Sequence, residues 1–129
     1  MACPADLKYT DTHEWARLED GVVTVGITAF AADALSDITY VDLPREGERT
    51  TAGERFGEIE SVKAVSDLAA PVSGEIVAVN ADLNDDPAAV SSDAYGAGWM
   101  IRIKADDPAQ MDALKTADEY ERMLAESEN

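Results

Sequence analysis

Alternating hydrophobic and polar residues predict that most of this chain is β-structure. Runs of this kind, rich in β-branched residues, cover 22–27, 38–43, 56–62, 65–69 and 75–79. Asp20–Gly21 is a typical hairpin turn and joins the first run to a strand over 14–18. A further strand is expected over 99–104, which alternates in the same way.

The strand over 38–43 also predicts which of its residues share a face. Strict alternation places Ile38 and Tyr40 on one face and Val41 on the other. Loops are expected over 45–55 and 80–87, and residues 88–97 show no clear period.

Helix signals are confined to three places. Thr28 is a typical N-cap residue, so a short helix is expected near 29–35. Asp107–Pro108 begins a second helix, and Thr116 with Glu119 three residues later forms a capping-box pattern for a third. The predicted fold class is therefore mainly β, with one short internal helix and helices at the C-terminal end.

The length of 129 residues is typical of one domain that can bury its own core. No repeat, linker or low-complexity segment divides the chain. We therefore expect a single domain over 1–129, with its core at about 7–124 and frayed termini.

The charge balance limits the partners. With 27 acidic and 10 basic residues, the formal net charge is −17, which disfavours nucleic acid and anionic membranes. No apolar run is long enough to span a bilayer, and the first residues lack the features of a secretory signal. The single cysteine, Cys3, cannot form an internal disulfide, which suits a reducing compartment. We expect a cytoplasmic protein, or a matrix protein if the chain is a processed mitochondrial form.

Several candidate chemistries lack an essential residue. Gly96 to Trp99 lacks the third glycine of a dinucleotide loop and precedes a strand. Asp82 to Pro87 has Pro87 where a calcium loop needs glycine, and one histidine with one cysteine cannot complete a usual structural zinc site. His13 could serve as the base of a hydrolase, but the chain has no Gly-x-Ser-x-Gly elbow.

Lys63 is the most distinctive candidate. It is one of four lysines and lies between two β-like runs, where Ser61 to Ala64 is expected to form the bend. A lysine at a tight bend points into solvent, and its small neighbours leave the amine approachable for attachment of a prosthetic group. An exposed hairpin lysine without a role stays an open alternative on these grounds alone.

The segment around Lys63 resembles a known family. Gly57 to Ala64 (Gly-Glu-Ile-Glu-Ser-Val-Lys-Ala), followed by Pro71 to Ile76, resembles the lipoyl-attachment segment of the glycine cleavage system H protein family. His13-Glu14-Trp15 resembles the opening motif of that family, and the resemblance extends from about Leu7 to Leu124. Val62 and Ala64 differ from the methionines of biotin carriers and from the aspartate that precedes the lysine in 2-oxoacid dehydrogenase lipoyl domains.

The resemblance implies a lipoyl-domain-like barrel-sandwich hybrid of two antiparallel sheets, with lipoic acid attached as an amide to Lys63. Glu60, Gly74 and Gly47 match positions associated with recognition by the lipoate-attaching enzyme. Ser36 departs from the family, which usually has glycine there.

The resemblance also implies a role as a shuttle rather than an enzyme. The lipoyl group would carry an aminomethyl group from glycine decarboxylase to the aminomethyltransferase, and dihydrolipoamide dehydrogenase would reoxidise it. A cleft on the carrier would hold the loaded arm. Two acids match positions in this cleft, Glu14 and Asp67, and Glu14 is expected to hold the amine of the arm. Four further residues match its wall: Thr12, Ile27, Leu35 and Ala64.

Other functions are retained as alternatives. The chain could relay lipoyl groups to other 2-oxoacid dehydrogenase complexes, act as a small hydrolase through His13, or serve as an unmodified β-sandwich interaction module. A monomer is expected. The acidity is consistent with partner docking and equally with a high-salt habitat.

Overall fold

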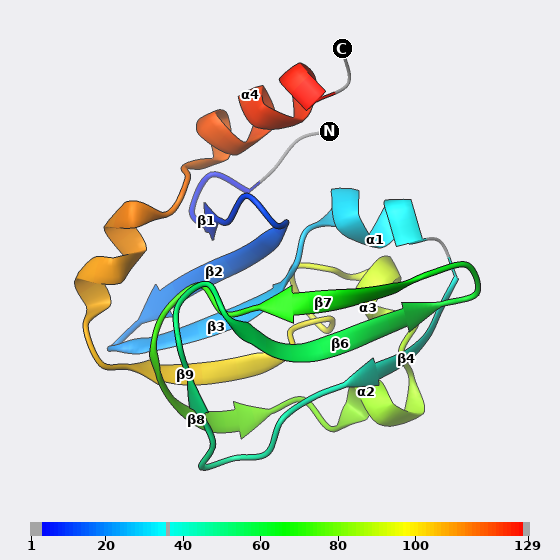
Figure 1. The fold of residues 1–129 in the computed structure, drawn as a ribbon, viewed down its shortest axis with the longest axis horizontal. Coiled ribbons are helices and arrows are strands. Elements are labelled where there is room, and N and C mark those ends of the chain that lie inside the picture. The colour runs from blue at the N-terminus through cyan, green and yellow to red at the C-terminus, as the bar shows by residue number, and fades with distance from the viewer. Residues whose placement is uncertain (1–3, 36, 128–129) are drawn as a thin grey trace.

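The computed structural model describes residues 4–35 and 37–127 (Figure 1). Cys3, Ser36 and the outermost ends, for which fraying was predicted, lie outside the described residues. At the C-terminal end the last helix continues to Ser127, three residues beyond the predicted core.

In the described residues, nine strands form two antiparallel sheets. The six-stranded sheet has the order β1 (Lys8–Tyr9), β2 (Glu14–Glu19), β3 (Val22–Ile27), β9 (Ile101–Ala105), β8 (Gly74–Val79) and β5 (Arg49–Thr50). The three-stranded sheet has the order β4 (Ile38–Asp42), β6 (Arg55–Ser61) and β7 (Val65–Ala69). The described strands form a sandwich rather than a closed barrel, and the predicted mainly-β fold with two antiparallel sheets is confirmed.

The local signals of the sequence are confirmed in the helices and in one turn. Asp20 and Gly21 have φ of +52° and +81° in the β2–β3 turn. Thr28 accepts a hydrogen bond from the amide of Ala31 and begins α1 (Ala29–Leu35). Thr116 and Glu119 exchange the two capping-box hydrogen bonds at the start of α4 (Ala117–Ser127).

The prediction that Ile38 and Tyr40 share one face of β4 was wrong. A register shift between Ile38 and Tyr40 adds one residue to β4, so Ile38 and Val41 are both buried whereas Tyr40 is exposed. Strict alternation cannot place these three residues in this way, because it puts Ile38 and Tyr40 on the same face.

Several short elements were not predicted. The segment expected to be loop or aperiodic contains α2 (Asp82–Asp85) and α3 (Ala89–Ser92), and the loop expected over 45–55 contains β5. Asp107 caps its helix as predicted, but the helix is the 3₁₀ helix η1 (Pro108–Ala113). Such elements of one turn or two residues carry too few positions for a periodic pattern.

Two clusters of hydrophobic residues form the interior. The larger one fills the space between the sheets, with Val25 and Ile103 from one sheet and Val41 and Ile59 from the other. The smaller one packs α4 against β1 and β2, and in it Tyr9 and Tyr120 stack with ring centroids 4.9 Å apart. The C-terminal helix is thereby packed against β2, the strand that carries Glu14.

The two glycines expected to take part in recognition have structural roles. A Cβ atom at Gly74 would collide with the carbonyl oxygen of Lys104 and with the side chain of Ile103. Gly47 has φ of +91°, open space around its Cα atom, and an amide that donates to Ile76 at 2.8 Å. Glycine is therefore required by packing at one position and by backbone conformation at the other.

Gly74→Ala is expected to lower the free energy of unfolding by about 2 kcal/mol, because the added methyl group must push strand β9 away. Gly47→Ala is the matched control and is expected to cost about 1 kcal/mol, from backbone conformation alone. Urea unfolding followed by tryptophan fluorescence measures both. Equal unfolding midpoints for Gly74→Ala and the parent chain would contradict the steric argument.

Candidate functional site

Lys63 lies in the tight turn between β6 and β7. The turn is closed by the amide of Ser61, which donates to the carbonyl of Ala64 at 2.8 Å. The hydroxyl of Ser61 accepts hydrogen bonds from the amides of Lys63 and Ala64. Val62, Lys63 and Ala64 are all exposed, so the predicted bend and its exposed lysine are present.

A cavity of about 190 Å³ lies beneath α1, beside the same hairpin. Its walls come from the start of β2, the end of β3, α1, β6 and β7. Most of the lining is apolar, for example Phe30, Leu35 and Ile59. Five of the six residues expected in a cleft line it: Thr12, Glu14, Ile27, Leu35 and Asp67. Ala64, the sixth, is exposed in the lysine turn and does not line this cavity.

Glu14 is the buried carboxylate of the cavity, with 1% of its surface exposed. The hydroxyls of Thr10 and Thr12 donate to its Oε1, and the amide of Ala69 donates to its Oε2 at 3.2 Å. Burial raises the pKa of Glu14 above its ordinary value of 4.5, and these hydrogen bonds oppose the rise. The three donors leave Oε2 with unused acceptor capacity.

Asp67 differs from Glu14 in its surroundings. Its side chain is 69% exposed, and its Oδ1 lies 3.1 Å from the Nε of Arg55. The carboxylate of Asp67 is therefore exposed and already paired, whereas the carboxylate of Glu14 is buried.

His13 also lines the cavity, which the sequence did not reveal. Its φ of +73° interrupts the alternation, so both His13 and its neighbour Glu14 reach the cavity. Its Nδ1 lies 2.8 Å from the hydroxyl of Tyr120, which lies 2.8 Å from the hydroxyl of Thr28. Burial lowers the pKa of His13, and Asp11 opposes this. The partner of Nδ1 is a tyrosine, not the carboxylate that a hydrolytic triad requires.

A larger cavity of about 470 Å³ lies on the other side of the donors to Glu14. Thr10, Thr12 and Ala69 line it, together with residues of η1 such as Gln110. Thr12 lines both cavities, so the hydrogen-bonded group around Glu14 forms the wall between them.

The positions expected to guide an attaching enzyme are separated in the fold. Glu60 lies on β6, three residues before Lys63, in the three-stranded sheet. Gly74 begins β8 in the six-stranded sheet, and Gly47 precedes β5. In Figure 1, β8 begins at the left of the molecule whereas the β6–β7 turn lies at the right. Only Glu60 is therefore beside the lysine.

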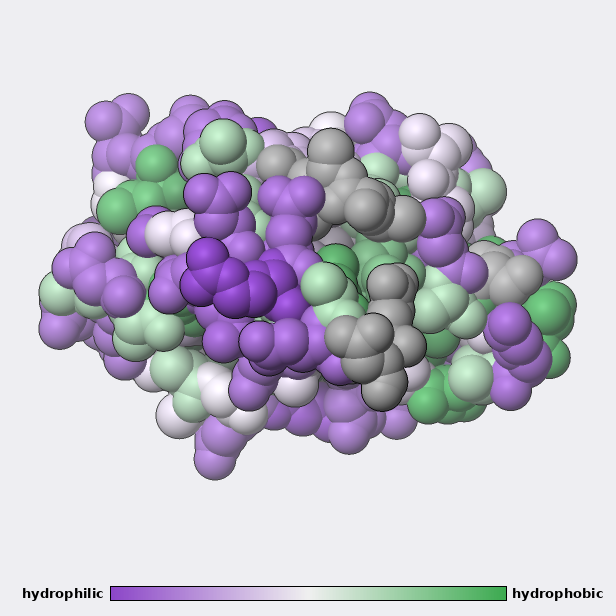
Figure 2. All heavy atoms as spheres, turned by 90° about the horizontal axis from the view of Figure 1, so that it is seen from above, coloured by the Kyte–Doolittle hydropathy of each residue, from purple (hydrophilic) through white to green (hydrophobic). Residues whose placement is uncertain are grey.

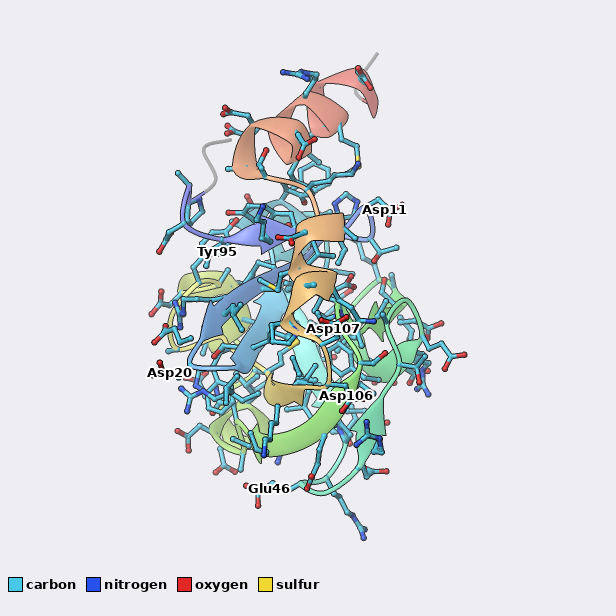
Figure 3. The ribbon with its side chains drawn as sticks, turned by 90° about the vertical axis from the view of Figure 1, so that its left-hand side faces the viewer. Asp11, Asp20, Glu46, Tyr95, Asp106 and Asp107 are labelled. Atoms are coloured by element: carbon cyan, nitrogen blue, oxygen red, sulfur yellow. The ribbon has the colours of Figure 1, made fainter. Side chains whose placement is uncertain are left out.

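The acidic side chains on one side of the molecule come from several separate connections. Figure 3 shows Asp11, Asp20, Glu46 and Asp106 on one side of the molecule, in four different connections. Within the described residues, no group of three or more His, Cys, Asp or Glu side chains is placed to hold a metal ion. The described helices are all too short or too polar to cross a membrane.

Comparison with known proteins gave consistent matches. The family described as Glycine cleavage H-protein matches residues 7–127. A glycine cleavage system H protein from Magnetococcus marinus is 50% identical over 124 residues, which is 96% of this chain and 89% of that protein. A probable glycine cleavage system H protein from Natronomonas pharaonis is 54% identical over 122 residues, covering 95% of this chain and 96% of its own. The crystal structure of a glycine cleavage system H protein from Mycobacterium marinum superposes with a TM-score of 0.89 at 45% identity, covering 95% and 99% of the two chains.

Thr10→Val is expected to raise the pKa of Glu14 further, because it removes a donor that favours the carboxylate. The parent chain should lose stability as the pH rises from 4.5 through the raised pKa of the folded state, since the fold favours the protonated acid. In Thr10→Val this loss should extend to higher pH. Carboxyl ¹³C NMR titration of Glu14 measures the pKa directly.

Thr39→Val is the matched control, because the hydroxyl of Thr39 donates to the carbonyl of Glu60, outside the cavity lining. Its Glu14 pKa should equal that of the parent chain. An unchanged Glu14 pKa in Thr10→Val would show that the threonine does not stabilise the ionised carboxylate.

Proposed function

The chain belongs to the glycine cleavage H-protein family, and we propose that it is the lipoyl-carrying shuttle of the glycine cleavage system. In this role it carries the aminomethyl group of glycine from the pyridoxal-phosphate decarboxylase to the tetrahydrofolate-dependent aminomethyltransferase. It is then reoxidised by dihydrolipoamide dehydrogenase. The chain is a carrier component and performs no catalysis of its own.

One observation carries the proposal. An exposed lysine in a tight turn lies on the same hairpin that walls a mostly apolar cavity with one buried carboxylate. The residues fit lipoic acid, because Lys63 offers an accessible amine for the amide and the cavity offers an apolar wall to its hydrocarbon chain. When bound, this group supplies the sulfur atoms that accept the aminomethyl group and undergo thiol–disulfide exchange.

In this proposal, Glu14 is the carboxylate that pairs with the positively charged amine of the loaded arm. An ammonium group that enters a buried site needs a carboxylate partner, because an unpaired buried charge is costly. Oε2 has the remaining acceptor capacity, and Thr10, Thr12 and Ala69 hold the carboxylate in place. Phe30, Leu35 and Ile59 add apolar surface to the lining of the same cavity.

The strong net acidity suits a protein that must dock with several enzymes and leave each of them. A net charge of −17 accelerates encounters with basic surfaces and makes them salt-sensitive. The proposed partners are glycine decarboxylase, aminomethyltransferase, dihydrolipoamide dehydrogenase and a lipoate-attaching enzyme. Covalent attachment raises the effective concentration of the cofactor at each of them. The proposed location is the cytoplasm, or the mitochondrial matrix for a processed chain.

Lys63→Arg is expected to abolish modification, because arginine cannot form the lipoyl amide. Intact-mass spectrometry after incubation with lipoate, ATP and an attaching enzyme should show one adduct on the parent chain, mapped to Lys63. Lys104→Arg is the control and should retain the adduct. With the three partner enzymes, only a lipoylated parent chain should support glycine-dependent NADH formation. An adduct without such activity would favour a lipoyl-relay role instead.

Glu14→Ala is expected to shorten the lifetime of the aminomethyl-loaded protein by about tenfold or more, since a hydrogen bond to a charged group contributes about 1.5–3 kcal/mol. Asp67→Ala should have a smaller effect, because that carboxylate is exposed and already paired with Arg55. Release of ammonia and formaldehyde from the loaded protein measures both rates. Equal lifetimes for Glu14→Ala and the parent chain would refute the role of Glu14.

A further inference from the structure

Three side chains form a row across the outer face of the three-stranded sheet. Tyr40 on β4 is the register partner of Glu60 on β6, which is the partner of Val65 on β7. Paired residues project to the same face of a sheet. The adjacent pair, Val41 and Ile59, is buried, so Tyr40, Glu60 and Val65 face away from the core. We call these three residues the Tyr40 row.

Two of the three side chains in the Tyr40 row are large hydrophobic groups that are exposed to solvent. Tyr40 is 49% exposed and Val65 is 59% exposed, and Val62 in the adjoining turn is 67% exposed. In Figure 2, hydrophobic atoms are visible at the right-hand end of the molecule, where Figure 1 places the β6–β7 turn. An exposed aromatic ring beside aliphatic groups is typical of an interface anchor.

The acidic residues on this outer face differ in whether they are paired with a basic side chain. The next row along the sheet contains Glu58 and Asp67, and Arg55 forms ion pairs with both. Within the described part of the chain, the carboxylate of Glu60 has no ion pair. The Tyr40 row therefore presents one uncompensated negative charge between two apolar side chains.

We propose that the Tyr40 row is the docking surface for the lipoate-attaching enzyme, with Tyr40 and Val65 against an apolar patch of that enzyme and Glu60 against a basic group. This inference rests on the proposed attachment of lipoic acid to Lys63. It goes beyond the expected part of Glu60, because it adds an aromatic anchor from β4, 20 residues before Glu60 along the chain.

The position of the row selects this enzyme among the four proposed partners. Ile59 and Ser66 line the cavity and are the chain neighbours of Glu60 and Val65 in the Tyr40 row. Leu68, three residues after Val65 on β7, also lines it. Alternation along the strands directs these side chains to the inner face. The aminomethyltransferase, which receives the loaded arm, must approach the cavity on that face. The decarboxylase and the dehydrogenase act on the sulfur atoms at the far end of the arm and not on the lysine itself. The attaching enzyme meets the bare lysine before any arm exists, and for it the outer face of the hairpin is sufficient.

The test compares attachment rates of unmodified variants. Tyr40→Ala is expected to lower kcat/KM for lipoate attachment by about tenfold, a typical loss for an aromatic interface anchor. Val65→Ser and Glu60→Gln should each lower it, mainly through KM. Val77→Ala is the matched control, because Val77 is 42% exposed on β8 in the other sheet, and its kcat/KM should not change. The readout is the rate of mass gain at Lys63, with circular dichroism to establish that each variant is folded.

The same variants, driven to complete lipoylation with excess attaching enzyme, are then assayed for glycine-dependent NADH formation. A loss confined to attachment supports the proposal. Equal attachment rates for Tyr40→Ala and Val77→Ala would overturn it, and so would an equal loss in both assays. Either result leaves the proposed function intact as long as the parent chain gains its adduct at Lys63, whereas a parent chain that gains none refutes the proposed function itself.

Discussion

The burial of the Glu14 carboxylate is the constraint on which the site depends. A carboxylate removed from water is destabilising unless hydrogen bonds compensate for the lost hydration. Here the donors come from both sheets, since Thr10 and Thr12 precede β2 whereas Ala69 ends β7. The carboxylate is therefore stabilised only when the two sheets have this relative position. The position of the Glu14 carboxylate in the cavity and the relative position of the two sheets therefore depend on each other.

The unusual backbone of His13 connects this centre to the C-terminal helix. A non-glycine residue at φ of +73° costs about 1 kcal/mol, and the contact of its ring with Tyr120 helps to offset that cost. Tyr120 also stacks on Tyr9 and bonds to Thr28 at the start of α1. The cavity wall at His13 and the first turn of α1 are thus both fixed by a helix far away in the sequence. Docking of α4 is a condition for the shape of the cavity.

The sequence predicted features with a local cause and missed those with a distant one. The Lys63 turn, the Asp20–Gly21 hairpin and the Thr116 capping box depend on a few neighbouring residues, and all are present. The facing of Ile38 depends on a bulge that only pairing with β6 reveals. The approach of His13 to the cavity depends on Tyr120, more than 100 residues away. Family resemblance indicated five cavity residues that pattern alone could not have selected, but it also indicated Ala64, which lies in the turn.

The bulge in β4 also explains how the three-stranded sheet can present the Tyr40 row on its outer face and still pack Ile38 in the core. Without the extra residue, Ile38 and Tyr40 would share a face, and either an isoleucine would be exposed or a tyrosine would enter the core. With it, Ile38 packs inside while Tyr40 joins Glu60 and Val65 on the outer face. Along β6 and β7, neighbouring residues alternate between the two faces. Ile59 and Ser66 line the cavity, whereas Glu60 and Val65 lie in the outer row. A substitution in the outer row therefore removes no side chain from the cavity lining, which is the basis for expecting recognition of the bare lysine to be separable from storage of the loaded arm.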